Sequence, residues 1–155
     1  MKTRLLLCAL AAYICGLWMV ALPAFAAERP NVVVLAVPTK GPNLKGPVYR
    51  HVAMRVAQDA DIIGFKKYVR AASSLKVKKK ARFLAKGARK IARSLSATHV
   101  LFVQPIKKKG KWNAAVTLLN VGSGKRLSVG RFPLAGRALS KAVGAKIYDA
   151  LKPHL

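Results

Sequence analysis

Apolar and polar positions alternate most regularly between Thr98 and Leu134, where apolar stretches are separated by one break rich in Lys and Gly and a second rich in Gly and Ser. This pattern predicts three β-strands joined by tight turns at Lys107–Lys111 and at Gly122–Gly124. A meander of this kind has an apolar face that helices must cover. The side chains expected on that face are Val100, Phe102, Trp112, Ala114, Val116, Leu118, Leu127 and Val129.

Two further strands are predicted ahead of the meander. Val32–Val37 is a continuous apolar run rich in valine, which is typical of a central strand covered on both faces. Asp61–Phe65 is a shorter apolar run and predicts a short strand. The segment between them begins with Pro38–Pro47, which holds three prolines and two glycines and is therefore expected to be a loop.

Apolar residues at four-residue spacing predict three amphipathic helices. The first is Val48–Ala60, and the last is Ala135–Lys152. Between them, Val77–Ser96 has the clearest pattern, with Leu84, Ala88, Ile91 and Leu95 expected to face inward. Lys66–Lys76 has no clear period and is expected to be an irregular link with room for a helical turn.

The inward faces expected for the first and last helices consist of Val48, Val52 and Val56 and of Leu139, Val143, Ile147 and Leu151. The order of elements is therefore βαβαβββα after an N-terminal signal helix. It predicts an α/β fold, a two-layer sandwich on a mixed sheet of about five strands. No internal repeat or long linker divides residues 28–155, which we expect to form a single domain.

Residues 1–27 have the pattern of a secretory signal peptide: a basic start, an uncharged stretch at Leu5–Leu22, and small residues at Ala24 and Ala26. Cleavage near Ala26 or Ala27 would place the mature chain in the periplasm or outside the cell. The alternative is an uncleaved inner-membrane anchor, because the uncharged stretch approaches the roughly 20 residues that span a bilayer. Both cysteines, Cys8 and Cys15, lie in this segment, so the mature chain must be stabilised by its core alone.

The charge is strongly unbalanced, with 30 Lys and Arg residues against only 4 acidic ones and a formal net charge of +26. Loss of Lys2 and Arg4 from those 30 leaves 28 basic residues and a charge of +24. So basic a surface attracts polyanions without a specific pocket. We expect an anionic envelope partner, which could be lipopolysaccharide, an anionic membrane surface, nucleic acid or an acidic protein.

The basic residues that we expect to bind the anion form two groups. The helix-start cluster consists of Lys76, Lys78, Lys79, Lys80, Arg82 and Lys86, and the hairpin cluster consists of Lys107, Lys108, Lys109 and Lys111. Three of these lysines fall in the first turn of a predicted helix, where the helix dipole disfavours cations unless an anion is bound. The alternative is an ordinary solvated basic face.

No catalytic or metal-binding pattern is present. Asp59 and Asp61 lie two residues apart at a predicted helix end, which suits capping better than acid–base chemistry. Gly122–Lys125 lacks the first glycine and the Ser or Thr of a phosphate-binding loop and is expected to be a hairpin turn. The three histidines are too scattered for a zinc site, and one of them, His99, is expected to be a partly buried strand residue. We expect no enzyme activity, no cofactor, no metal and no small-molecule substrate.

Three stretches resemble the amino-terminal domain of TolB and the related CsgG-like and FlgO-like envelope domains. They are the opening strand Val32–Pro38, the turn and strand Ser96–Val103, and the strand and turn Val116–Gly124. The resemblance implies an anticodon-binding-like α/β fold and a mostly non-enzymatic role through protein contacts at the envelope. It supports an alternative function, an accessory module of an envelope or secretion complex in which the charge is incidental.

Overall fold

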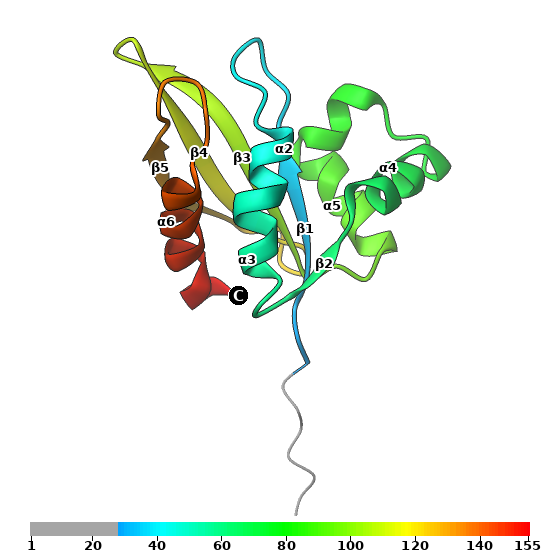
Figure 1. The fold of residues 1–155 in the computed structure, drawn as a ribbon. Helices are drawn as coiled ribbons and strands as arrows, with labels where there is room; N and C mark the ends of the chain where they lie inside the picture. The colour runs from blue at the N-terminus through cyan, green and yellow to red at the C-terminus, as the bar shows by residue number, and fades with distance from the viewer. Residues whose placement is uncertain (1–27) are drawn as a thin grey trace, which may run out of the picture.

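The structure, a computed structural model, describes residues 28–155 (Figure 1). The predicted signal peptide, residues 1–27, lies outside the described residues. The strands are β1 (Asn31–Ala36), β2 (Asp61–Ile63), β3 (His99–Lys108), β4 (Lys111–Asn120) and β5 (Arg126–Pro133).

The helical segments follow the expected order with one addition, α4, between β2 and β3. They are α2 (Lys45–Val48), the π-helical turn η1 (Tyr49–Ala53), α3 (Met54–Val56), α4 (Phe65–Ser74), the 3₁₀ helix η2 (Lys79–Phe83), α5 (Ala85–Ser94), α6 (Lys141–Leu151) and the 3₁₀ turn η3 (Lys152–His154).

The five strands form one mixed sheet in the order β2-β1-β3-β4-β5. Strand β1 runs parallel to both β2 and β3, whereas β3, β4 and β5 form the antiparallel meander. The predicted mixed sheet of about five strands is therefore confirmed.

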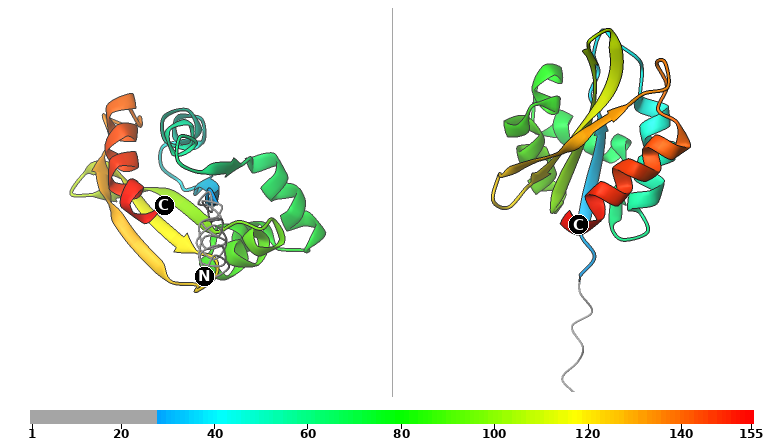
Figure 2. Two further views of the ribbon diagram at one scale, coloured as in Figure 1. Left: turned by 90° about the horizontal axis from the view of Figure 1, so that it is seen from below. Right: turned by 90° about the vertical axis from the view of Figure 1, so that its left-hand side faces the viewer.

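Helices cover both faces of this sheet. Val32 and Val34 of β1 belong to one apolar cluster and Val33 and Leu35 to another, because successive strand residues point to opposite faces. The right-hand view in Figure 2 shows α4 and α5 on one side of the sheet and α2, α3 and α6 on the other. The α/β fold class is confirmed, but the sandwich has three layers where two were expected, because β1 and β3 are apolar on both sides.

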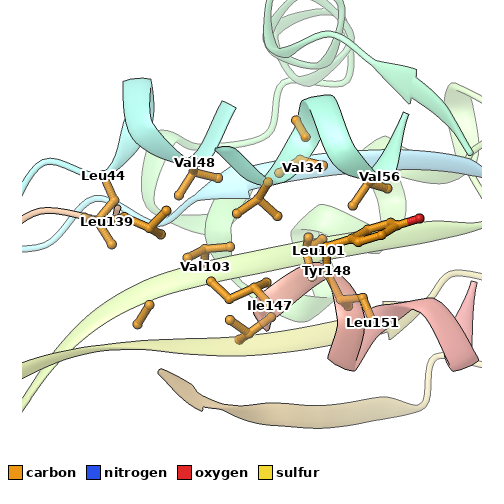
Figure 3. Packing of buried hydrophobic residues seen from close by; sticks show 14 of the residues in the cluster. Val34, Leu44, Val48, Val56, Leu101, Val103, Leu139, Ile147, Tyr148 and Leu151 are labelled. Atoms are coloured by element: carbon orange, nitrogen blue, oxygen red, sulfur yellow. The ribbon is translucent and has the colours of Figure 1, made fainter. Parts of the chain in front are cut away.

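The first apolar cluster joins the continuous helical segment α2–η1–α3 to α6 across β1 and β3. Val48 and Val56 point into the same cluster as Ile147 and Leu151 of α6 (Figure 3). Val52 and Ile147 are fully buried, in agreement with the inward faces predicted for the first and last helices. The ends of these two helices differ from the predicted ones. The first helix ends at Val56 and not at Ala60. Helix α6 begins after Ser140, whose hydroxyl accepts a hydrogen bond from the Val143 amide at 3.3 Å and so caps the helix.

The second apolar cluster lies beneath α4 and α5. Residues Lys66–Lys76, expected to be an irregular link, mostly form α4, which buries Tyr68 and Ala72 completely. The sequence pattern is weak there because the buried side of the helix is made of small residues and one tyrosine. The prediction of an irregular link was therefore wrong.

The predicted helix Val77–Ser96 is broken. Leu84 has φ −94° and ψ 147°, an extended conformation that separates η2 from α5, and its side chain is 62% exposed. The break folds η2 back onto α5 so closely that a Cβ atom on Gly87 would lie 2.0 Å from the carbonyl oxygen of Ala81. Ala88 and Ile91 face inward as predicted, but Leu84 does not.

The meander has the predicted strands, but its apolar side chains do not share one face. Val100 and Phe102 belong to the cluster beneath α4 and α5, whereas Ala114, Val116 and Leu118 belong to the other cluster. The remaining three predicted residues, Trp112, Leu127 and Val129, are only partly buried or exposed. The single-face prediction was wrong because β3 is covered on both sides.

Candidate anion-binding surface

The helix-start cluster lies on the link from α4 to α5. Lys76 follows the end of α4 with a positive φ of 52°, and Lys78, Lys79 and Lys80 are exposed on the link and on η2. Lys86 is exposed in the first turn of α5. Because α5 begins only at Ala85, Lys78, Lys79 and Lys80 precede it and do not lie in its first turn, where they were predicted.

Arg82 differs from the other cluster residues because its side chain is used within the protein. Its Nε donates to the carbonyl oxygen of Val77 at 3.1 Å, and its Nη2 donates to the Ser73 hydroxyl at 3.3 Å. Its own carbonyl oxygen accepts a hydrogen bond from Tyr68 at 2.5 Å. Arg82 thus holds η2 against α4 and is less available for a ligand than the lysines around it.

The hairpin cluster surrounds the β3–β4 turn, which consists of Lys109 and Gly110 alone. Both residues have positive φ, 48° and 76°, as a two-residue type I′ turn requires. Lys108 and Lys111 face each other directly across the two strands. Lys107 is paired with Trp112 and points to the opposite face of the sheet.

Both clusters lie at the same end of the molecule, where β1 ends. Figure 1 shows the β3–β4 turn, the loop 37–44 and η2 along this end. The loop lies between the clusters: the ring of Trp112 packs against Gly41, where a Cβ atom would be 2.5 Å away, while Pro38 lines a hollow together with Lys79 and Lys80. The structure therefore brings the clusters to one end of the fold without direct contact between them.

A third basic surface, on α5, was not predicted, because its basic residues have the pattern of an ordinary solvated helix face. Lys86, Arg89, Lys90 and Arg93 follow one side of α5 at spacings of three and four residues and line a hollow of about 500 Å³ with Leu119 and Gly124. The Arg89 Nε donates to the carbonyl oxygen of Val121 at 2.8 Å, and its Nη2 donates to that of Gly122. The spacing of these four basic residues by three and four along the helix is the sequence pattern that could have predicted this surface.

The acidic residues lie away from both clusters. Asp59 follows α3, Asp61 begins β2 and Asp149 lies near the end of α6, at the opposite end of the fold (Figure 1). Within residues 28–155 the single ion pair joins Arg29 to Asp61 at 3.8 Å. Asp59 accepts a hydrogen bond from Tyr148, which raises the pKa of the Tyr148 hydroxyl. Within the described chain, no carboxylate forms an ion pair with a lysine of either cluster.

His99 is a half-buried strand residue, as predicted. Its Nδ1 lies 3.0 Å from the Thr98 hydroxyl and its Nε2 lies 3.4 Å from the amide nitrogen of Asn120. Burial lowers the pKa of the imidazole. Within residues 28–155 no three His, Asp or Glu side chains come together as metal ligands would.

None of the helices in the described part of the chain has the length and apolar run needed to cross a bilayer.

Comparisons with known proteins show a shared fold. The C-terminal domain of LpoB from Escherichia coli matches with a TM-score of 0.57 and 15% identity, over 69% of this chain and 83% of that one. The lipoprotein GNA1162 from Neisseria meningitidis matches with a TM-score of 0.52 and 12% identity, over 80% and 95%. TolB from Acinetobacter baumannii matches with a TM-score of 0.47 and 13% identity, over 81% of this chain and 28% of that one.

No protein-family model matches the chain, and no curated protein sequence does. Membership of the TolB-like group therefore stays a prediction. The chain shares its α/β fold with the LpoB C-terminal domain and with the lipoprotein GNA1162.

Proposed function

We propose that this chain is an exported, non-catalytic module of the cell envelope that binds an anionic partner through the helix-start and hairpin clusters. The partner is a polyanion: lipopolysaccharide, an anionic lipid surface, nucleic acid or an acidic protein. The fold shared with a lipoprotein, GNA1162, and the signal-like residues 1–27 support an envelope location.

The observation that carries the proposal is the absence of carboxylates from these clusters. The exposed lysines at this end form no ion pair within residues 28–155. Lys108 and Lys111 face each other across the hairpin, and like charges in directly opposite positions destabilise a sheet. An anion bound between them would remove this repulsion.

Binding would be driven by counterion release. A polyanion that contacts several lysines releases its condensed counterions, so its affinity falls steeply as salt rises. The direct test is retention of the purified mature protein on heparin at increasing sodium chloride. The logarithm of the binding constant should fall linearly with the logarithm of salt concentration, whereas retention that does not change with salt would contradict the proposal.

A second candidate function is a protein-interaction accessory module whose charge is incidental. Strand β5 supports it, because within residues 28–155 β5 pairs with β4 alone and its other edge can take a partner's strand. Charge reversal of the two lysine clusters separates the candidates. Capture of the partner should be lost if the clusters bind it and should be unchanged if β5 does.

A further inference from the structure

Three hollows meet around Phe65, at the end of the sheet that carries the lysine clusters. The first, about 270 Å³, lies between β1, α2 and Phe65. The second, about 360 Å³, lies beside the loop 37–44, and the third, about 350 Å³, lies between α4 and η2. Phe65 lines all three, so they form one interrupted depression, called here the Phe65 groove.

The fold explains why a groove forms at this place. The helices that follow β1 cover one face of the sheet, whereas α4 and α5, which follow β2, cover the other face. In open α/β sheets, connections that leave toward opposite faces open a crevice at the carboxyl ends of the strands, which is where such folds bind ligands. Phe65 lies at this crevice as the first residue of α4, separated from β2 by Gly64 alone.

The lining of the groove is apolar and its charged rim is only positive. Pro38, Phe65 and Phe83 supply the apolar surface. Lys45, Lys79 and Lys80 stand at the rim, and no acidic residue among residues 28–155 lines any of the three hollows. The ammonium group of Lys45 lies 4.8 Å from the centre of the Phe65 ring, which places a positive charge directly beside the apolar surface.

The loop that borders the groove is stiffened before any ligand arrives. Pro38 and Pro42 fix their own φ angles in this loop, and Pro42 is buried. A wall with so few alternative conformations loses little entropy when a ligand binds, so the groove is suited to recognition in its present shape.

We propose that the Phe65 groove binds an acidic polypeptide segment that carries apolar side chains. This inference rests on the proposed function and names its partner as a protein. The positive rim pairs with the acidic residues of the segment, and the apolar hollows take its large side chains. A lipid acyl chain needs one continuous channel, whereas the side chains of Phe65 and Lys45 divide this groove into separate hollows that suit successive side chains of a peptide.

One position allows the groove to be blocked without disturbing the core. Gly46 lines the first hollow and is exposed, and apart from its chain neighbours and its own helix backbone no atom of residues 28–155 lies within 4 Å of the point where a Cβ atom would be. Gly46→Trp should therefore fill the mouth of the groove in a protein that still folds. Gln58→Trp is the matched control, because Gln58 is exposed beside Asp59 at the acidic end of the fold.

The test compares two short glutamate-rich peptides of equal length and charge. One contains phenylalanine and leucine, and the other has serine in their place. The wild-type protein should bind the apolar peptide about tenfold tighter, the ratio expected from burial of one large apolar side chain. Gly46→Trp should abolish this preference while heparin retention stays as in the wild type. Gln58→Trp should keep the preference, and circular dichroism should show that both variants are folded.

Equal affinity for the two peptides would overturn the inference, and so would a preference that survives in a folded Gly46→Trp protein. In either case the proposed function still stands if heparin binds in a salt-dependent manner. Failure of heparin and of both peptides to bind would instead contradict the proposed function. Phosphatidylglycerol vesicles form the third arm. If Gly46→Trp weakens vesicle binding and leaves peptide binding unchanged, the groove holds a lipid and the peptide proposal is wrong.

Discussion

The hydroxyl of Tyr68 donates a hydrogen bond to the carbonyl oxygen of Arg82 at 2.5 Å, which ties α4 to η2. Tyr68 is completely buried, and burial raises the pKa of its hydroxyl well above the usual value. The bond holds the segment that carries Lys79 and Lys80, so the core of the protein fixes the position of part of the helix-start cluster.

Removal of this hydroxyl should destabilise the protein. Tyr68→Phe leaves the ring in place but deprives the Arg82 carbonyl of its partner, and we expect a loss of about 1 to 2 kcal/mol in the free energy of unfolding. Urea unfolding followed by circular dichroism measures this loss. Val69→Ala, a change at the partly buried neighbour, is the control for a simple packing effect. A Tyr68→Phe protein as stable as the wild type would show that the bond contributes nothing.

The strands could be predicted from the sequence because their apolar runs are long and bounded by turn residues. The break at Leu84 could not be predicted, because leucine at that position continues the helical spacing of Ala88 and Ile91. The break allows η2 to fold back, so that Ala81 lies against Gly87 and the Arg82 carbonyl oxygen accepts the hydrogen bond from Tyr68 of α4. These tertiary contacts run against a locally consistent helical pattern.

The basic residues of the candidate site could be predicted from the sequence, but their arrangement in the fold could not. The runs Lys78–Lys80 and Lys107–Lys109 are visible in the sequence. Their position at one end of the fold depends on the parallel pairing of β1 with β3, which no local pattern encodes. The Phe65 groove could not be predicted for the same reason, because its lining comes from β1, α2, α4, η2 and the loop 37–44.

Neutralising lysines in the two clusters should reduce the salt dependence of heparin binding. The test variant replaces four exposed lysines by serine, namely Lys79, Lys80, Lys108 and Lys111. The same measurement with double-stranded DNA as the probe gives the expected size of the effect. Each replaced lysine that contacts the DNA should reduce the magnitude of the slope of log K against log salt by about 0.9. A matched variant replaces four exposed lysines outside the two clusters and away from Phe65, namely Lys90, Lys125, Lys146 and Lys152. Equal slopes for the two variants would show that binding follows total charge and not these clusters.

His99 should make the protein less stable in mild acid. Burial holds the pKa of its imidazole below the ordinary 6.5, and Lys125, Arg126 and His154 line the same hollow. Between the ordinary and the lowered pKa the unfolded chain binds more protons than the folded one, so the free energy of unfolding falls as pH drops through this window.

The histidine contribution can be isolated by substitution. His99→Asn cannot titrate, so its stability should fall less than that of the wild type between roughly pH 7.5 and roughly pH 5.5. Urea unfolding at both pH values gives the comparison, with His154→Asn as the control that keeps His99. The same loss in the wild type and in His99→Asn would assign the acid sensitivity to other groups.

Gly144 should tolerate no side chain, because α6 packs directly against η1 at this residue. A Cβ atom there would lie 2.5 Å from the carbonyl oxygen of His51 and 2.7 Å from its Cβ atom. The neighbour is backbone that cannot move aside, so Gly144→Ala should force the two helices apart and cost about 1 to 3 kcal/mol, the usual penalty of overpacking. Gly46→Ala is the matched control: Gly46 is also helical but has open space, and alanine should leave stability unchanged or raise it by up to about 1 kcal/mol. The midpoint of thermal unfolding is compared between the two variants and the wild type. If Gly144→Ala unfolds at the same temperature as the wild type, α6 and η1 do not approach this closely.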